Sequence, residues 1–244
     1  MEKCHLCIGL MPVELIVKEI QSKFDFDAIA DGYDLWYETA EGAMYDRLEK
    51  KAISRYLPKN VRGIKLLEIG CGTGHWSQFF SECGFEVTGV DVSERMIKIA
   101  QNKGIPNASF QIMDGQSLPF GDDSFDVAAA ITTLEFVDNA ESVVQEMLCC
   151  TRKPAGQLLI GVLNALAGFN RRRQQDPESL YAKARLFSPK QLKRLLEPYG
   201  QANITAAAFV PSRRRFLFLS PLIDTVGRML HLPYGVFVAA KVRL

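Results

Sequence analysis

Residues 66–74 read LLEIGCGTG, an apolar run that leads directly into three alternating glycines, Gly70, Gly72 and Gly74. The first four residues have the composition of a buried strand, and a helical pattern follows the last glycine. Glycine lets the backbone turn at positive φ and lets a ligand approach where a Cβ would otherwise stand. At the carboxyl end of a strand in an open α/β sheet, such a turn forms a ligand-binding crevice. The stretch therefore favours an α/β fold and marks its site.

Strand-like and helix-like segments alternate on both sides of this stretch. Alternation at this spacing predicts βαβ units and a mostly parallel, doubly wound sheet covered by helices on both faces. We expect strands at residues 65–70, 86–91, 109–113, 125–131, 157–162, 203–210 and 236–242. We expect helices at residues 41–57, 76–83, 94–102 (with Ser93 as N-cap), 138–151 and 188–197, and a further helical stretch over 224–232.

Composition limits the remaining possibilities. The chain has 244 residues, of which 48% are hydrophobic and 23% charged, so it can bury a large core and is not disordered. We expect a tail over residues 1–24 and a single domain over 25–244. Within that domain, residues 25–60 are predicted to form a helical cap, and 163–187 and 211–234 to form lid or insertion segments. No apolar run is long enough to span a membrane, and the N-terminus lacks the pattern of a secretory signal.

Six cysteines in a chain of this length are not a disulfide scaffold, and we expect reduced thiols in a cytoplasmic protein. Cys4 and Cys7 have Cys-x-x-Cys spacing, but no second pair stands at zinc-site spacing. We therefore predict no metal site. Residues 12–20 have the pattern of a short amphipathic helix.

The charge of the chain is unevenly distributed. Residues 1–170 carry 15 Lys and Arg against 24 Asp and Glu, a formal charge of −9, whereas residues 171–244 carry 14 against 4, a charge of +10. The densest basic points are residues 171–173 and 213–215. A localised positive field suggests an anionic or amphipathic small-molecule acceptor or a lipid headgroup, although a solvated basic face explains it as well.

The acidic residues near the glycines distinguish this site from a dinucleotide site. The fingerprint G-x-G-x-x-G would need a third glycine at position 75, where the chain has His75. Glu68 suits a ligand with an ammonium group and fits poorly beside a pyrophosphate. Asp91 ends the second expected strand, 21 residues beyond Gly70, where a carboxylate can accept from both ribose hydroxyls. Asp114 ends the third and can accept from an adenine amine.

Taken in order, these landmarks resemble the class I S-adenosylmethionine-dependent methyltransferases, in particular the small-molecule branch that includes ubiquinone and menaquinone methyltransferases. The resemblance covers roughly residues 24–165. It implies a Rossmann-like fold of seven strands with the last antiparallel. It rests on Glu68-x-Gly70-Cys71-Gly72-Thr73-Gly74, Val90-Asp91-Val92-Ser93, Asp114-Gly115, Leu118-Pro119-Phe120 with Phe125-Asp126-Val127, and the N-terminal Phe26-Asp27 with Tyr33-Asp34-x-Trp36-Tyr37.

The resemblance also implies a role for each matching residue. The loop from Gly70 through Cys71, Gly72 and Thr73 to Gly74 would pass beside the methionine moiety of S-adenosyl-L-methionine, whose product is S-adenosyl-L-homocysteine. Glu68 would hold the ammonium and Asp91 the ribose hydroxyls. The remaining implied contacts are Val92, Met96, Asp114 and Gly115 at the adenine, Thr132 on the methionine side, and Tyr33 and Tyr37 from the cap.

The expected reaction is an in-line displacement that transfers a methyl group to a small-molecule or lipid-like acceptor. The sulfonium supplies the activation, so the protein needs a general base only where the nucleophile must lose a proton. Candidates for that group are Glu135, just beyond the fourth expected strand, and His231, in the late lid segment. Each also fits a purely structural role. His5 and His75 are the other histidines.

Several other functions stay open from the sequence. A nicotinamide-dependent oxidoreductase and a non-catalytic S-adenosylmethionine-binding protein are the main alternatives. Arsenic methylation would need converging cysteines, and nucleic acid is an unlikely partner because no basic strand carries interleaved aromatics. Arg213-Arg214-Arg215 precedes the apolar residues 216–219, a pattern that fits peripheral contact with a membrane as well as an ordinary hydrophobic lid. The acceptor atom and the oligomeric state cannot be read from the sequence.

Overall fold

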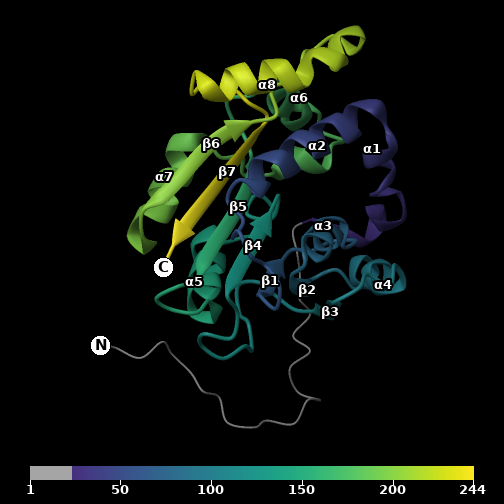
Figure 1. Cartoon of the computed structure of the whole chain (residues 1–244). Coiled ribbons are helices and arrows are strands. Elements are labelled where there is room, and N and C mark those ends of the chain that lie inside the picture. Colours follow the sequence, from purple (N-terminus) through teal and green to yellow (C-terminus); the bar gives the residue numbers. More distant parts are fainter. Residues whose placement is uncertain (1–23) are drawn as a thin grey trace.

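The computed structural model describes residues 24–244, and its strands form one sheet in the order β3-β2-β1-β4-β5-β7-β6 (Figure 1). All pairs from β3 across to β5 are parallel. β7 is antiparallel to both β5 and β6, which confirms the predicted sheet with its last strand reversed. The strands are β1 (Lys65–Ile69), β2 (Glu86–Asp91), β3 (Ala108–Ile112), β4 (Val127–Ile131), β5 (Gln157–Leu163), β6 (Ala202–Ala207) and β7 (Phe237–Arg243).

Helices cover both faces of this sheet, as Figure 1 shows. They are α1 (Leu35–Glu38), α2 (Ala40–Ser54), α3 (His75–Cys83), α4 (Glu94–Asn102), α5 (Ala140–Cys150), α6 (Gly168–Gln175), α7 (Pro189–Leu196) and α8 (Ser220–Met229). Short 3-10 helices are η2 (Asp27–Gly32), η3 (Leu180–Lys183), η4 (Glu197–Tyr199) and η5 (Arg214–Leu219).

Side chains that hydrogen-bond to free backbone N–H groups fix where α4 and α7 begin. Ser93 accepts a hydrogen bond from the backbone N–H of Met96 at 3.1 Å, as predicted for the start of α4. Ser188 and Gln191 form a reciprocal capping box at α7, where Pro189 occupies the first turn and loses no intrahelical hydrogen bond. These caps place the helix starts within a residue or two of the expected positions.

The core consists of one apolar layer on each face of the sheet. On one face, β4 and β5 pack against α5 and α7 through residues such as Val143, Met147 and Leu192. On the other face, α2 and α3 bury Leu48 and Phe80 against the same strands. Burial on both faces explains why the central strands are almost continuously apolar in sequence.

The end of β6 and the start of α8 are among the element boundaries that differ from the sequence expectation. β6 ends at Ala207, three residues early, because Ala208 has φ +60°, a left-handed conformation that a strand does not continue through. α8 begins at Ser220, ahead of the expected residue 224, because Pro221 fits the first turn of a helix.

The two predicted insertion segments both contain helices. Residues 163–187 hold α6 and η3, and residues 211–234 hold η5 and α8. None of the helices in residues 24–244 is both long and apolar enough to cross a bilayer. The expected tail, with Cys4, His5, Cys7 and the helical stretch at 12–20, lies outside the described residues.

Candidate active site

The glycine loop connects β1 to α3 and borders an open cavity. Gly70, Gly72 and Gly74 have φ of +71°, +52° and +80°, so each uses the conformational freedom that glycine alone offers cheaply. A Cβ at Gly70 would lie 2.4 Å from the side chain of Thr133, whereas a Cβ at Gly72 would meet nothing within 4 Å. The backbone at Gly72 therefore leaves room for a ligand to approach it.

Asp91, at the end of β2, is held by backbone donors. Its Oδ2 accepts from the N–H of Gly72 at 2.8 Å, and its Oδ1 accepts from the N–H of Ser93 at 2.9 Å. Burial raises the pKa of this carboxyl, and the backbone donors partly offset that rise. The carboxylate lines the same cavity as Gly72. Its position at a strand end, beside a glycine loop, suits an acceptor for ligand hydroxyls.

Glu68 lies beneath the loop and is almost completely buried. Ser77 donates a 2.5 Å hydrogen bond from its Oγ to Oε2 of Glu68. Burial raises the pKa of Glu68 to about 8, and the nearby Asp91 adds to the rise. A buried acid in this state gains its charge most readily when a cationic group comes beside it.

The N-terminal cap is fastened to the loop and to α4 by acidic side chains. Thr73 donates from its Oγ1 to Oδ1 of Asp34 at 2.6 Å, and Lys103 pairs with the other oxygen of Asp34 at 2.6 Å. Ser93 donates from its Oγ to Asp27 at 2.5 Å. These contacts bring Tyr33 and Tyr37 over the cavity. Burial raises the pKa of both phenols, so they stay neutral.

Thr132, immediately after β4, has a backbone conformation unusual for a β-branched residue, with φ +51°. Its N–H still donates to the carbonyl oxygen of Gly161 at 2.7 Å. Thr133 fastens the turn by approaching the carbonyl oxygens of Ile69 and Ile131 at 3.0 and 3.1 Å. Strain of this kind is concentrated at functional sites, and Thr132 lines the cavity.

The residues expected beside the adenine lie after β3 and at the start of α4. Asp114 accepts from the backbone N–H of Gln116 at 2.9 Å, which orders the turn after β3. Gly115 is needed there because a Cβ would lie 2.3 Å from Ile69. Met96 of α4 is fully buried and lines the cavity together with Val92.

The structure brings thirteen of the fourteen predicted cofactor residues to one cavity. Gly74 is the exception: a Cβ there would face Ile105, Ala100 and Phe110, on the side of α4 and β3. The predicted residues that line the cavity are Tyr33, Tyr37, Glu68, Gly70, Cys71, Gly72, Thr73, Asp91, Val92, Met96, Asp114, Gly115 and Thr132. Lining residues absent from the prediction are Phe26, Ile69, His75, Trp76, Met113, Gln116, Ile131, Thr133, Phe136, Val137 and Asp138.

A second cavity adjoins the first. Tyr33, Tyr37, Thr132 and Phe136 line both, so these four side chains form the boundary between them. The walls of the second cavity are largely aromatic, with three ionisable residues among them, Asp46, Glu49 and Arg173. Its other lining residues are Ala28, Ile29, Gly32, Trp36, Tyr45, Leu163, Phe169, Leu180, Tyr181 and Val236.

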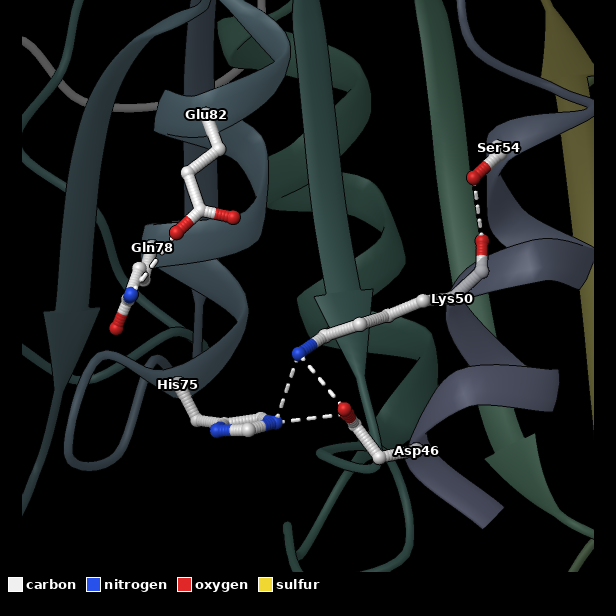
Figure 2. A network of polar contacts seen from close by, with 6 residues as sticks. All are labelled: Asp46, Lys50, Ser54, His75, Gln78 and Glu82. Carbon is white, nitrogen blue, oxygen red and sulfur yellow. Dashed lines mark hydrogen bonds and ion pairs between the residues drawn. The ribbon is translucent and has the colours of Figure 1, made fainter. Parts of the chain in front are cut away.

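Asp46, Lys50 and His75 form a polar network, which Figure 2 shows, and it links residues of the two cavities. His75, which lines the first, places its Nε2 2.7 Å from Asp46, which lines the second. Lys50 reaches Asp46 at 2.9 Å and the same His75 nitrogen at 3.0 Å. Since Asp46 can only accept, we assign the Nε2 proton to the bond with Asp46. Burial raises the pKa of Asp46, but His75 and Lys50 outweigh it and hold that pKa low.

His75 also stacks face to face on Tyr37, with ring centroids 3.6 Å apart and planes 4° from parallel. The network therefore fixes the orientation of a tyrosine that borders both cavities. The sequence offered little signal for it, because Asp46 and Lys50 stand one helical turn apart on α2 and look like an ordinary surface pair.

The two predicted catalytic residues lie elsewhere. Glu135 is buried, accepts from the N–H of Leu163 at 2.5 Å, and lines neither cavity. Burial raises its pKa to about 8. His231 is exposed and lines a different cavity, together with Arg55 and Arg228. These positions give no support to a role for either residue at the methyl acceptor.

Comparison with known proteins connects this geometry to a family. Residues 42–206 match the family model described as "Methyltransferase domain". An uncharacterized protein of Methanocaldococcus jannaschii is 32% identical over 183 residues, covering 74% of this chain and 82% of that protein. A demethylmenaquinone methyltransferase of Renibacterium salmoninarum is 29% identical over 135 residues, and the match spans 55% of each chain, only about half the length of that enzyme.

Solved structures agree on the fold. A crystal structure from Thermotoga maritima, titled an S-adenosylmethionine-dependent methyltransferase and possible histamine N-methyltransferase, superposes with a TM-score of 0.69 at 24% identity. The superposition covers 89% of this chain and 97% of that one. The chain belongs to the class I methyltransferase family and is an S-adenosylmethionine-dependent methyltransferase.

Proposed function

We propose that S-adenosylmethionine lies in the first cavity in a defined orientation. Glu68 faces the ammonium of the methionine moiety, Asp91 accepts from the ribose hydroxyls, and Asp114 accepts from the adenine amine. Support comes from the open space at Gly72 and from the burial of Glu68, whose raised pKa suits a cationic neighbour. Tyr33, Tyr37 and Thr132 then border the reacting end, where the first cavity meets the second.

We further propose that the methyl acceptor is a small amphipathic or lipid-like molecule and that it binds in the second cavity. The observation that carries this proposal is the shared wall: Tyr33, Tyr37, Thr132 and Phe136 line both cavities. An acceptor there lies directly beside the methionine end of the first cavity. Aromatic walls from Trp36, Tyr45, Phe169 and Tyr181 favour an acceptor with a flat apolar body.

Arg173 gives this cavity its polarity. Its guanidinium carbon lies 3.4 Å from the ring centre of Tyr181 and 5.3 Å from that of Phe169. Among the described ion pairs, Arg173 has no carboxylate partner. Of the two acids nearby, Asp46 is paired with Lys50, and burial raises the pKa of Glu49 to about 8. Arg173 is therefore available to bind an oxygen-bearing or anionic group on the acceptor.

The chemistry asks little of the protein beyond alignment. When bound, the sulfonium supplies an activated methyl group. The cap residues exclude water, and the shared wall holds the nucleophile in line with the methyl carbon, which is where enzymes gain much of their rate. Tyr33 and Tyr37 stay neutral, so they can donate or accept a hydrogen bond without carrying charge.

Isotope transfer tests the proposal. The purified chain is incubated with methyl-deuterated S-adenosylmethionine and, separately, with aqueous and lipid extracts, and labelled products are identified by mass spectrometry. We expect a labelled product in one of these two pools. Cofactor binding without a labelled product in either pool would overturn the acceptor proposal and favour a non-catalytic binding role.

A variant pair then tests the second cavity. Arg173→Met should raise the acceptor KM by roughly 10- to 100-fold, the loss of one charge-assisted hydrogen bond, with the affinity for S-adenosylmethionine unchanged. Arg172→Met is the matched control, since Arg172 is exposed and lines neither cavity. Equal effects of the two substitutions would contradict binding at Arg173.

A further inference from the structure

Helix α8 directs its polar residues toward the protein and its apolar residues toward solvent, the reverse of an ordinary surface helix. Asp224 is fully buried and pairs with the buried Arg228 at 2.7 Å. Asp224 also accepts from the backbone N–H of Ala208 at 2.8 Å. At Gly227 a Cβ would lie 2.8 Å from the ring of Phe209, so the helix approaches the protein closely on this side.

The opposite side of α8 is an apolar stripe. Leu222 is 64% exposed, Val226 45%, Met229 73% and Leu230 64%. Their spacing of four, seven and eight residues puts all four on one face of the helix. A contiguous exposed apolar face of this kind marks an interaction surface rather than a random scatter of hydrophobic residues.

The apolar face continues into the segments on either side of the helix. Phe218 in η5 is 72% exposed, and Tyr234, after the helix, is 62% exposed. In Figure 1, η5 and α8 form the yellow helical segment at one end of the molecule, lying across β6 and α2. We call this region the α8 surface: the exposed residues are Phe216, Phe218, Leu222, Ile223, Val226, Met229, Leu230, Leu232 and Tyr234.

The exposed formal charge within residues 211–234 is entirely positive. Arg213, Arg214 and Arg215 are all exposed at the start of η5. Between residues 211 and 234 the sequence contains a single acid, Asp224, which is buried and paired with Arg228. The segment thus shows three arginines to solvent and no carboxylate.

A cavity at the edge of this surface adds one further exposed cation, Arg55. Arg55, Arg228 and His231 line it, and so do Met229 and Leu232 of the α8 surface. Thr205 and Thr225 contribute hydroxyls. Its polar lining residues are thus basic or neutral, and none of its residues lines the two cavities of the active site.

We propose that the α8 surface docks the protein onto the surface of an anionic lipid bilayer. Its apolar stripe enters the headgroup boundary, and Arg213, Arg214 and Arg215 pair with anionic headgroups. An apolar helix face flanked by arginines and aromatic residues is the pattern of interfacial membrane helices. Basic residues at such a face are attracted by the negative potential of the bilayer.

The charge pattern favours a bilayer over a protein partner. A protein interface needs about one hydrogen bond per 100–200 Å², yet the side chains along the stripe are apolar over its whole length. A second copy of this chain, packed stripe to stripe, would offer the arginine triplet no compensating exposed acid from residues 211–234. A fluid layer of acyl chains under anionic headgroups matches both features of the surface.

Vesicle co-sedimentation of the full chain tests this inference, and it needs neither cofactor nor acceptor. Its outcome is therefore independent of the proposed acceptor. The wild-type protein is mixed with vesicles of phosphatidylcholine alone or of phosphatidylcholine with phosphatidylglycerol, at low and high salt. We expect binding to the anionic vesicles only, weakened at high salt because the Debye length falls.

Two variants test the two parts of the surface. The triple substitution Arg213→Gln, Arg214→Gln, Arg215→Gln should weaken binding roughly 100-fold, from about fivefold per arginine. Leu222→Ser with Met229→Ser should weaken binding without changing its relative salt dependence. All five positions are exposed, so the variants should unfold at the wild-type temperature.

Matched controls come from elsewhere on the chain. Lys190→Gln, Lys193→Gln, Arg194→Gln removes the same charge from exposed positions of α7, and Ile112→Ser removes an exposed apolar residue of β3. Both controls should bind as the wild type does. Absence of wild-type binding to anionic vesicles at low salt, or equal losses in the α7 control, would overturn the inference. So would self-association in solution that Leu222→Ser with Met229→Ser abolishes.

Discussion

The N–H of Gly72 donates a 2.8 Å hydrogen bond to Oδ2 of Asp91, and this bond joins the glycine loop after β1 to the end of β2. The other oxygen of Asp91 accepts from Ser93 at the start of α4. One carboxylate therefore orders two backbone segments that border the first cavity. Its remaining lone pairs are available to a ligand, because a carboxylate offers about four acceptor positions.

Replacing Asp91 should separate its structural and binding roles. We expect Asp91→Ala to weaken S-adenosylmethionine binding at least 100-fold, since a pair of hydroxyl contacts to a charged acceptor is lost. The free energy of unfolding should fall by only about 1–3 kcal/mol, from the two N–H groups left without an acceptor. Isothermal titration calorimetry and urea unfolding measure the two effects. Normal affinity in the variant would show that Asp91 does not contact the cofactor.

The raised pKa of Glu68 predicts proton release on cofactor binding. Without ligand, this carboxyl has a pKa of about 8 and is mostly protonated at pH 7. A cofactor ammonium beside it favours the carboxylate, so binding should release up to one proton and tighten as pH rises toward 8. Calorimetry in two buffers of different ionisation enthalpy measures the release.

Glu68→Gln should abolish that proton release, and Glu135→Gln should not, since Glu135 has a similarly raised pKa but lines neither cavity. Proton release that persists in Glu68→Gln would assign it to another group and remove the support for an ammonium contact.

Alanine substitutions at Gly70 and Gly72 should lower the free energy of unfolding by clearly different amounts. Gly70→Ala places a Cβ 2.4 Å from Thr133, which is itself held to Ile69, so we expect a loss of stability of more than about 2 kcal/mol. Gly72→Ala meets no atom within 4 Å and costs only the strain of its positive φ, roughly 1 kcal/mol. Thermal unfolding of the ligand-free variants ranks the two, and similar costs would contradict this packing.

The sheet could be predicted because burial on both faces leaves apolar runs at β1, β4 and β5, and because strand-like segments lead to Gly70, Asp91 and Asp114. Carboxyl ends of parallel strands meet at one edge, so most of the lining of the first cavity followed from strand positions alone. Gly74 is the exception, because the turn into α3 directs it toward α4.

The second cavity could not be predicted in the same way. It is built from segments distant in sequence, where α2, α6 and η3 meet, and only their packing brings Asp46, Arg173 and Tyr181 to one cavity. Thr132 gave no local signal of its left-handed backbone, which is imposed by the surrounding turn. Likewise, periodicity alone indicates that α8 has an apolar face but not which face meets solvent.

Glu135 should make the stability of the ligand-free protein depend on pH. Its pKa is about 8 in the folded state against 4.5 for an ordinary glutamate, so the folded protein holds more protons between these values. Stability should therefore fall as pH rises from about 5 to 8, by at most about 1.4 kcal/mol per pH unit for this group. Urea unfolding at pH 6 and 8 measures the slope, which Glu135→Gln should reduce. An unchanged slope would assign it to other groups, such as Glu49 or Glu68.

The buried ion pair between Asp224 and Arg228 of α8 should lose different amounts of stability when one or the other residue is replaced. Asp224→Ala leaves the Arg228 guanidinium buried, and Arg228 has no other side-chain hydrogen bond in residues 24–244, so we expect a loss of about 3–5 kcal/mol. Arg228→Met should cost less, because Asp224 keeps the N–H donors of Ala208 and Phe209 at 2.8 and 3.4 Å. Urea unfolding of both variants and of the double variant measures the coupling. A greater loss in Arg228→Met would mean that the arginine, not the aspartate, fastens α8 to the end of β6.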